Sequence, residues 1–223
     1  MKFSAVIFDL DGTVLLNEDV YASAFLAILA KHGVRADTPG VDSRIVHTPG
    51  VGVERNWEIF KKRYNLPSEV GVDQLVHETQ DEYHKRLPEV GIRPGFFNLH
   101  GALAEEGIQI ALATSNDWWL VEDELTDLGL LPYFNVTVTR EEVVNPKPEP
   151  DIFWKAAEKL GVPEEACVVI EDSIAGIKAA GEAGMKVIAV LGTNTDKKGL
   201  READLVVEDF LEINPQIIDG LFG

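Results

Sequence analysis

The sequence lacks the features that mark a secreted, membrane-spanning or nucleic-acid-binding protein. Cys167 is its single cysteine, which excludes an intrachain disulfide and favours a reducing compartment. No apolar run approaches the roughly 18 residues of a membrane-spanning helix, and the N-terminal segment has no signal-peptide pattern. Basic residues are scarce: 20 Lys and Arg face 38 Asp and Glu, and the net charge of -18 repels nucleic acid and anionic membranes. We therefore expect a cytoplasmic protein that binds neither nucleic acid nor membrane.

The sequence does contain a repeated alternation of short β-branched runs and helical patterns, which is typical of parallel strands joined by crossover helices. The run 4–8 is apolar without alternation, which predicts a central strand buried on both faces. Further strands are expected at 108–113, 136–138, 167–170, 187–190 and 205–207. Helices are expected between them, with the clearest start and stop signals at 116–129 and 150–161. The predicted fold class is α/β with a Rossmann-like parallel sheet.

Residues 17–88 form a block without strand signals. Helical periodicity predicts helices at 17–33, 53–64 and 72–87, and Asn17 is expected to cap the first of them. A helical block of roughly 70 residues, placed directly after the first strand, is typical of an insert into an α/β core. We therefore expect a Rossmann-like catalytic core of residues 1–16 and 89–223 and an inserted α-helical cap of residues 17–88.

Polar residues follow the predicted strands at the edge where open parallel sheets bind ligands. They are Asp9 and Asp11 after the first strand, Thr114, Ser115 and Asn116 after the second, Lys147 before the helix at 150–161, and Glu171 and Asp172 after the strand at 167–170. Each motif alone also has a structural explanation, as a capped turn, a solvated loop or a helix N-cap. Their order, each at a strand end or an adjoining turn, favours one common site.

The four carboxylates of this set predict a divalent metal ion. Asp9 and Asp11 leave the sheet on the same side, because successive side chains of an extended segment alternate. Together with Glu171 and Asp172 they would repel one another and raise each other's pKa values unless a cation lay among them. Oxygen ligands of this kind suit Mg²⁺, and all five histidines lie outside the motifs, which argues against zinc.

Lys147 adds one positive charge among these acids, and the resulting set suits phosphoryl transfer. Its ammonium group can neutralise a phosphoryl oxygen or hold an aspartate ionised as a nucleophile. The hydroxyls of Thr114 or Ser115 and backbone N–H groups near Asn116 can bind the remaining oxygens. One aspartate would attack phosphorus to form an aspartyl phosphate, and a second acid would protonate the leaving oxygen and later activate water.

The motifs together resemble those of the haloacid dehalogenase superfamily of phosphotransferases. They stand at residues 8–13 (Phe-Asp-Leu-Asp-Gly-Thr), 114–116 (Thr-Ser-Asn), 147–150 (Lys-Pro-Glu-Pro) and 171–176 (Glu-Asp-Ser-Ile-Ala-Gly), and the resemblance covers the predicted core. It implies that Asp9 is the nucleophile and Asp11 the general acid/base. It further implies a Mg²⁺ site of Asp9, the Asp11 backbone carbonyl and Asp172, with Glu171 bound directly or through water, and a phosphoryl site of Thr114 and Lys147. The insert would correspond to the family's cap, which closes over small substrates.

Within the superfamily, the chain resembles the phosphoglycolate phosphatase-like and β-phosphoglucomutase branches. Dehalogenases lack an acid at the place of Asp11, so carbon–halogen chemistry is disfavoured. The mutase pattern has a Thr and a His where this chain has Asn17 and Tyr21, and a basic residue where it has Asp117, which weakens the mutase interpretation. Many phosphatases of this branch carry an acid where Leu16 stands, so no named phosphatase is indicated.

The sequence leaves the substrate and the oligomeric state open, and the cap offers only candidates for substrate contacts. Arg55 is the first candidate to grip a distal anionic group, with Arg44 and Lys61 as rivals; a solvated, charge-rich helix face is the alternative for each. We expect a Mg²⁺-dependent phosphatase that acts on a small phosphorylated metabolite. The alternatives are a hexose phosphomutase, which returns the phosphoryl group to a sugar, and a non-catalytic phosphoacceptor like a receiver domain, against which Asp11 and the helical lid argue.

Overall fold

Six parallel strands form one sheet in this computed structural model, which describes residues 1–34, 48, 51–192 and 199–223. The strand order is β5-β4-β1-β6-β7-β8, so β1 lies centrally between β4 and β6, as the apolar run predicted. The bounds are β1 Ala5–Phe8, β4 Gln109–Ala113, β5 Val136–Val138, β6 Cys167–Glu171, β7 Lys186–Val190 and β8 Leu205–Val207. The predicted α/β fold with a Rossmann-like parallel sheet is confirmed, and all six predicted strands are present.

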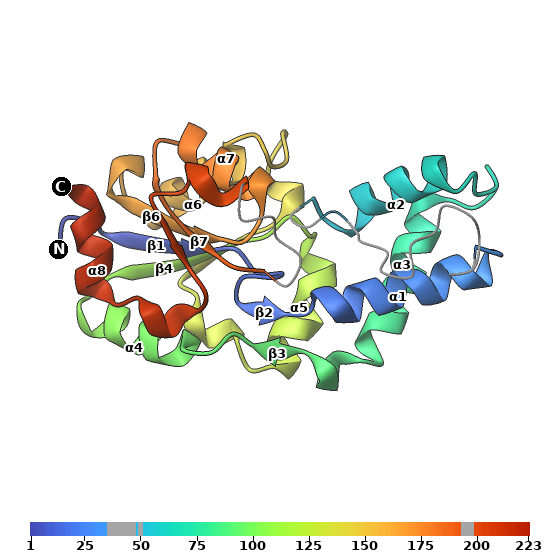
Figure 1. Cartoon of the computed structure of the whole chain (residues 1–223), viewed down its shortest axis with the longest axis horizontal. Helices are drawn as coiled ribbons and strands as arrows, with labels where there is room; N and C mark the ends of the chain where they lie inside the picture. Colours follow the sequence, from blue (N-terminus) through green and yellow to red (C-terminus); the bar gives the residue numbers. More distant parts are fainter. Residues whose placement is uncertain (35–47, 49–50, 193–198) are drawn as a thin grey trace.

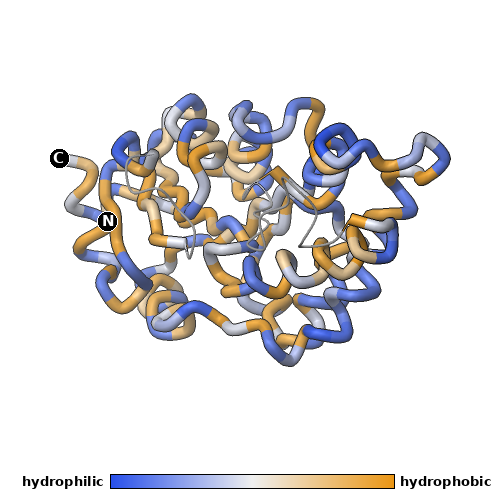
Figure 2. The backbone as a smooth tube through the Cα atoms, turned by 45° about the vertical axis from the view of Figure 1, so that its right-hand side comes forward, coloured by the Kyte–Doolittle hydropathy of each residue, from blue (hydrophilic) through white to orange (hydrophobic). Residues whose placement is uncertain are grey.

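Alternating side chains of the strands fill two separate hydrophobic cores. On β1, Ala5 and Ile7 face one core, whereas Val6 and Phe8 face the other. Helices α6 (Asp151–Leu160) and α7 (Ile174–Glu182) cover the first face, and α4 (Phe96–Glu105) and α8 (Pro215–Asp219) lie on the opposite side (Figure 1). Every residue of β1 and β6 is buried. Along the backbone, hydrophobic and hydrophilic segments alternate in both the sheet part and the insert (Figure 2). Burial on both faces explains why these strands read as unbroken apolar runs.

The helix signals in the core placed α5 (Trp118–Asp127) and α6 correctly. Gly161 ends α6 in the left-handed conformation with φ 70°, and Pro150 occupies its N-cap, one residue before the predicted position. Trp118 packs against the core, as its place on the apolar stripe predicted. Trp119 is 42% exposed and its ring stacks on His77, with the ring centroids 4.5 Å apart.

Three helices form the insert, at the end of the molecule remote from both chain termini (Figure 1). They are α1 Glu18–Lys31, α2 Val53–Arg63 and α3 Val72–His84. Their shared core is aromatic: the Phe25 ring lies edge-on to both Trp57 and Phe60, with centroids 5.3 Å apart in each pair. Helix α3 stops before the predicted residue 87, because Pro88 has no N–H to continue the helical hydrogen bonds.

The two segments that connect the sheet to the helical insert form a strand pair with each other, which the sequence did not predict. Strands β2 (Leu15–Leu16) and β3 (Gly91–Ile92) form an antiparallel pair directly before α1 and after α3. Asn17 follows β2 and occupies the N-cap position of α1, but its side chain makes no capping hydrogen bond. The expected capping role of Asn17 was wrong, because its amide is bound to Asp11 instead.

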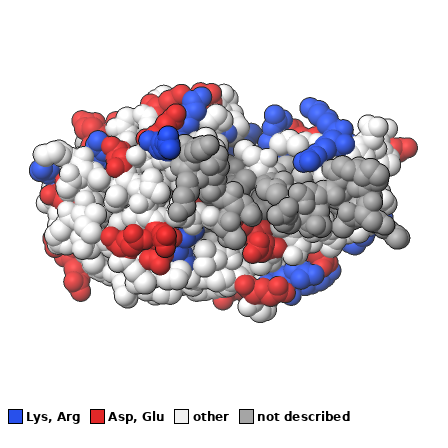
Figure 3. Space-filling model, viewed as in Figure 1, with Lys and Arg blue, Asp and Glu red and all other residues white. Residues whose placement is uncertain are grey.

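The surface carries charges of both signs. On the face seen in Figure 3, acidic and basic side chains lie among one another over both the sheet part and the insert. None of the helices in the described part of the chain has the length and apolarity of a membrane-spanning segment. Cys167 is buried at the start of β6, in keeping with its predicted role as a small core residue.

Candidate active site

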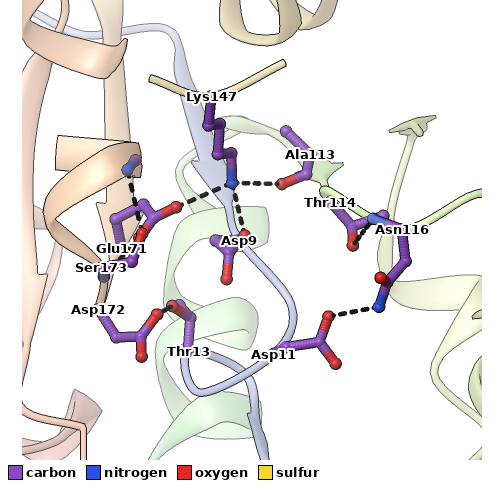
Figure 4. A network of polar contacts seen from close by, with 11 residues as sticks. Asp9, Asp11, Thr13, Ala113, Thr114, Asn116, Lys147, Glu171, Asp172 and Ser173 are labelled. Carbon is purple, nitrogen blue, oxygen red and sulfur yellow. Dashed lines mark hydrogen bonds and ion pairs between the residues drawn. The ribbon is translucent and has the colours of Figure 1, made fainter. Parts of the chain in front are cut away.

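The carboxyl ends of β1, β4 and β6 bring the predicted polar residues to one place (Figure 4). Lys147 lies at its centre, with Nζ 2.6 Å from Asp9 Oδ1 and 2.8 Å from Glu171 Oε1. Its Nζ also donates a hydrogen bond of 3.2 Å to the carbonyl oxygen of Ala113. Burial lowers the pKa of Lys147, but Asp9 and Glu171 outweigh this effect and raise the pKa above its ordinary value. The lysine therefore carries its charge although its side chain is buried.

Three carboxylates, from Asp9, Glu171 and Asp172, form a buried group with the geometry to hold a metal ion. One oxygen of each lies within 4.8 Å of the others. Burial raises the pKa of Asp9 to about 8, although Lys147 lowers it, and burial and the charges of Glu171 and Asp9 raise the pKa of Asp172. These acids carry their full negative charge at neutral pH only with more positive charge beside them. A hard divalent cation with oxygen ligands, such as Mg²⁺, fits this donor set.

The turn after β1 contacts the metal-binding group and is itself held by an arginine. Thr13 Oγ1 donates to Asp172 Oδ1 at 3.3 Å, and Gly12 adopts a positive φ of 78° to make the turn. Arg93 Nε donates to the carbonyl oxygen of Thr13 at 2.6 Å, and Arg93 Nη2 donates to that of Gly12. Sequence reasoning missed Arg93, because a lone arginine beside Pro94 gives no local signal of burial.

Two side-chain amides hold the carboxylate of Asp11 apart from the metal-binding group. Asn17 Nδ2 donates to Asp11 Oδ1 at 2.7 Å. Asn116 Nδ2 donates to Asp11 Oδ2 at 3.0 Å, as Figure 4 shows. Asn116 Oδ1 in turn accepts from the backbone N–H of Val53, at the start of α2, at 3.2 Å. Burial raises the pKa of Asp11, although the hydrogen bond from Asn17 lowers it. An acid held this way, beside Asp9 but outside its metal-binding group, is placed to exchange protons with a molecule bound there.

The predicted phosphate-binding residues Thr114, Ser115 and Asn116 form the loop after β4. Thr114 is buried, and its hydroxyl accepts a hydrogen bond of 3.2 Å from the backbone N–H of Asn116. This N–H group therefore donates within the loop, and binding of phosphoryl oxygens by N–H groups near Asn116 stays a prediction. Ser115 lines a cavity of about 40 Å³ together with Asp9 and Asp11. The loop thus borders the space above the acids.

The insert supplies the other walls of the site. Tyr21 and Phe25 of α1 line the cavity above Asp9 and Asp11. Beside it, a larger cleft of about 640 Å³ lies between α2 and the loop of Lys147, and Arg55 is on its wall.

The structure also locates two of the three predicted cap contacts. The guanidinium of Arg55 pairs with Glu58 on the same exposed face of α2. The Lys61 ammonium group donates to the carbonyl oxygen of Val70, within the insert. Arg44 lies outside the described residues. Of the three, Arg55 is placed on the wall of the cleft.

Residues 6–190, which include every predicted site residue, match the haloacid dehalogenase-like hydrolase family. The chain belongs to this family. The predicted resemblance is confirmed, and the chain is a hydrolase whose relatives include several named phosphatases.

Two relatives illustrate the range of this hydrolase family. The phosphorylated carbohydrates phosphatase of Thermotoga maritima is 30% identical over 229 residues, which cover 96% of this chain and 99% of the relative. The protein SUPPRESSOR OF QUENCHING 1 of Arabidopsis thaliana is 36% identical over 197 residues, 86% of this chain. The chain spans 18% of the length of that second relative. The same hydrolase unit therefore occurs alone and within a longer protein.

Two solved structures share the whole fold of this hydrolase. β-Phosphoglucomutase from Clostridium difficile has a TM-score of 0.81 at 26% identity and covers 99% of this chain and 97% of its own. CbbY from Rhodobacter sphaeroides, in complex with xylulose-(1,5)bisphosphate, has a TM-score of 0.81 at 26% identity and covers 94% and 96%. Both coverages include the sheet and the helical insert, so the insert is part of the shared fold.

The hydrolase also contains buried acids that the sequence motifs did not reveal. Glu18 is 5% exposed; burial raises its pKa, and its neighbour Asp172 lowers it. Glu124 on α5 is fully buried, and burial and the charge of Asp11 raise its pKa to about 8. A signal for Glu124 does exist: it stands three residues after Val121 and beside Leu125, on the buried stripe of its helix.

Proposed function

We propose that the protein is a Mg²⁺-dependent phosphatase that hydrolyses a small phosphomonoester through an aspartyl-phosphate intermediate. The observation that carries this proposal is the separation of the two aspartates. Lys147 binds Asp9 inside the acidic group, whereas two amides hold Asp11 outside it. A nucleophile and an acid/base of the same residue type need such different surroundings.

In the proposed reaction, an Asp9 oxygen attacks the phosphorus of the substrate, and the bond from phosphorus to the leaving oxygen breaks. Asp11 gives its proton to that oxygen, which departs as an alcohol. Asp11 then takes a proton from water, and the water oxygen attacks the phosphorus of the aspartyl phosphate. Inorganic phosphate leaves and Asp9 is regenerated. Lys147 and the Thr114–Asn116 loop would bind the phosphoryl oxygens.

Asp9, the backbone carbonyl of Asp11, Asp172 and Glu171 would hold the Mg²⁺ ion. The ion would supply positive charge that offsets the repulsion between the carboxylates and the phosphoryl oxygens. The carboxyl groups of the site must be ionised to hold the ion, and the raised pKa values of Asp9 and Asp172 support a cation among them.

Residues 17–88 would act as the cap that closes over the substrate, with residues 1–16 and 89–223 as the catalytic core. Support comes from the cavity, which is lined by Asp9 and Asp11 of the core and by Tyr21 and Phe25 of the insert. A substrate enclosed there must be small. The names of the relatives, a phosphatase of phosphorylated carbohydrates and a protein crystallised with a sugar bisphosphate, favour a phosphorylated metabolite of sugar-like size. Arg55 would contact a second anionic group of such a substrate.

The test is phosphate release from an aryl phosphate by the purified protein. Asp9→Asn should lower the rate by several orders of magnitude, and chelation of divalent ions should abolish it. Glu158→Gln, which alters an exposed acid far from the motifs, is the matched control and should keep full activity. Turnover by Asp9→Asn at the wild-type rate would show that Asp9 is not the nucleophile.

A hexose phosphomutase is the second candidate, favoured by the shared fold with a β-phosphoglucomutase. The same aspartyl phosphate would then return its phosphoryl group to a sugar rather than to water. Incubation with β-glucose 1-phosphate separates the two candidates. Glucose 6-phosphate formed faster than inorganic phosphate would identify a mutase, whereas phosphate as the main product would identify a phosphatase.

A further inference from the structure

Behind Asp11 lies a chain of buried polar side chains from three distant parts of the sequence. Asn17, which donates to Asp11 at 2.7 Å, also donates to the hydroxyl oxygen of Tyr83 at 3.1 Å. The Tyr83 hydroxyl donates to Glu124 Oε1. Asn17, Tyr83 and Glu124 are each 0% exposed. This row of buried side chains therefore runs from Asp11, the proposed acid/base, through the insert to α5 of the core without reaching solvent.

These hydrogen bonds constrain one another. The Tyr83 hydroxyl has a single proton, which it donates to Glu124 Oε1, so the hydroxyl oxygen is left to accept from Asn17. On the other side of the amide, Asn17 Oδ1 accepts from the backbone N–H of Gly12 at 3.3 Å. The amide of Asn17 thus has one favourable orientation, with its NH₂ group toward Asp11 and Tyr83 and its carbonyl toward Gly12.

A flipped Asn17 would bring its carbonyl oxygen against the Asp11 carboxylate, where two acceptors repel. The acceptor at Glu124 opposes that flip, because it leaves Tyr83 no proton to donate to Asn17. Glu124 itself is costly to bury, and its hydrogen bonds go to a hydroxyl and an amide rather than to a lysine or an arginine. A leucine would fill the same place on the apolar stripe of α5 without this cost.

We propose that Tyr83 and Glu124 are positioning residues for Asp11, and that they act through Asn17 to hold its carboxyl group where it can reach the leaving oxygen. This proposal rests on the proposed function, in which Asp11 is the general acid/base. Neither residue touches the substrate. Their contribution is to keep one orientation of the Asn17 amide and thereby one position of Asp11.

The same contact depends on how the insert sits on the core. Tyr83 belongs to α3 and Glu124 to α5, and these helices also meet at Gln80, whose Nε2 donates to the Leu120 carbonyl oxygen at 2.8 Å. The Tyr83 ring is further held by stacking on Tyr21, with centroids 4.1 Å apart. The position of Asp11 is thereby linked to the seating of α3 on α5.

Leaving-group dependence tests this role, because only a poor leaving group needs the proton of a general acid. The experiment measures kcat/KM of the Mg²⁺-loaded enzyme for an alkyl phosphate, glycerol 3-phosphate, and for an activated aryl phosphate, dinitrophenyl phosphate. This constant reports the steps up to transfer of the phosphoryl group, so later hydrolysis does not mask the effect. Tyr83→Phe removes only the hydroxyl, and Glu124→Leu removes only the acceptor.

Both variants should lose about 10- to 100-fold in kcat/KM for the alkyl phosphate and less than about threefold for the aryl phosphate. Glu124→Gln keeps an oxygen acceptor for Tyr83 and should retain the wild-type ratio between the substrates. Gln74→Ala changes an exposed residue of α3 that contacts neither α5 nor these buried side chains, and it should also keep that ratio. Thermal unfolding of each variant identifies any that does not fold. In that case the test relies on Tyr83→Phe and Glu124→Gln, which change the side-chain volume least.

Asp11→Asn separates failure of this proposal from failure of the proposed function. It should lose activity selectively toward the alkyl phosphate. If it does so while Tyr83→Phe and Glu124→Leu lower both substrates equally or neither, the positioning role is overturned and the function of Asp11 stands. If Asp11→Asn itself shows no selectivity, Asp11 is not the general acid, and both proposals are overturned.

Discussion

A Cβ atom on Gly12 would overlap the carboxylate of Asp172. The backbone of Gly12 passes so close to this acid that only a residue without a side chain fits, and its φ of 78° adds a second reason for glycine. The turn after β1 and the loop after β6 are thereby packed together at the proposed metal site. The backbone contact sets the place of Asp172 as much as its hydrogen bond from Thr13 does.

Gly12→Ala should lower phosphatase activity by more than about 100-fold, because the new methyl group displaces Asp172 from the site. Gly107→Ala is the matched control: Gly107 also has a positive φ, of 72°, but nothing lies near its missing Cβ. Both variants should lose about 1 kcal/mol of stability from left-handed strain. Equal activities of the two variants, measured by steady-state kinetics, would contradict the special role of the contact at Gly12.

Mg²⁺ should stabilise the folded protein through the buried carboxylates. At a concentration about 100 times its Kd, an ion that binds only the folded state adds about 2.7 kcal/mol, or roughly 5 to 10 °C in Tm for a chain of this size. Asp172→Asn should remove most of this gain. Thermal unfolding in Mg²⁺ and in chelator gives the shift, with Asp204→Asn at an exposed ion pair as the control that keeps it. An unchanged shift in Asp172→Asn would argue against Asp172 as a ligand.

Glu124 should make the free energy of unfolding fall as pH rises. Its pKa is raised to about 8 in the folded protein, so between its ordinary value and pH 8 the folded state binds a proton that the unfolded state has released. The contribution is fully present at low pH and is lost at up to about 1.4 kcal/mol per pH unit in this window.

The glutamine of Glu124→Gln cannot titrate. The free energy of unfolding of this variant, relative to that of the wild type, should therefore increase as pH rises from about 5 to about 8. Urea denaturation of both proteins in chelator measures the difference, and Asp9, which is present in both, cancels. A difference that stays constant over this range would mean that Glu124 is already ionised when buried.

Arg55→Ala should raise KM for a sugar bisphosphate about tenfold and leave KM for the matching monophosphate unchanged, with kcat similar in both cases. The physical reason is that Arg55 lies on the wall of the cleft next to the Lys147 loop, where its exposed guanidinium can exchange its ion pair with Glu58 for a second anionic group. Lys62→Ala, on the same helix, is the control that should change neither constant. Equal effects on KM for both substrates would mean that Arg55 acts through the overall charge of the site and does not contact a second anionic group.

The main elements and the central acids could be predicted because their signals are local. An apolar run without alternation marks a strand buried on both faces, and a parallel sheet collects whatever follows its strands at one edge. Asp9, Glu171 and Asp172 stand at such places in the sequence, and Lys147 stands just before a predicted helix. The structure brings all four together.

The surroundings of Asp11 could not be predicted in the same way. Asn17 has the position of a helix cap, and its sequence context is the same whether its amide binds the backbone of α1 or the carboxylate of Asp11. Glu124 lies on the apolar stripe of α5, but it also stands in a row with Glu122 and Asp123, and acids in such a row are ordinarily solvated. Burial of Glu124 against Tyr83, 41 positions away, depends on α3 packing on α5.

The sequence by itself determined the α/β fold, the helical insert and the identity of the acids at the strand ends, because strand burial and sheet edges follow from patterns a few residues long. Only the tertiary structure decided which side chains orient Asp11, where Arg93 is buried and how closely Gly12 approaches Asp172. Those contacts join segments far apart in the chain, and their geometry is set by packing between elements rather than by any neighbouring residue.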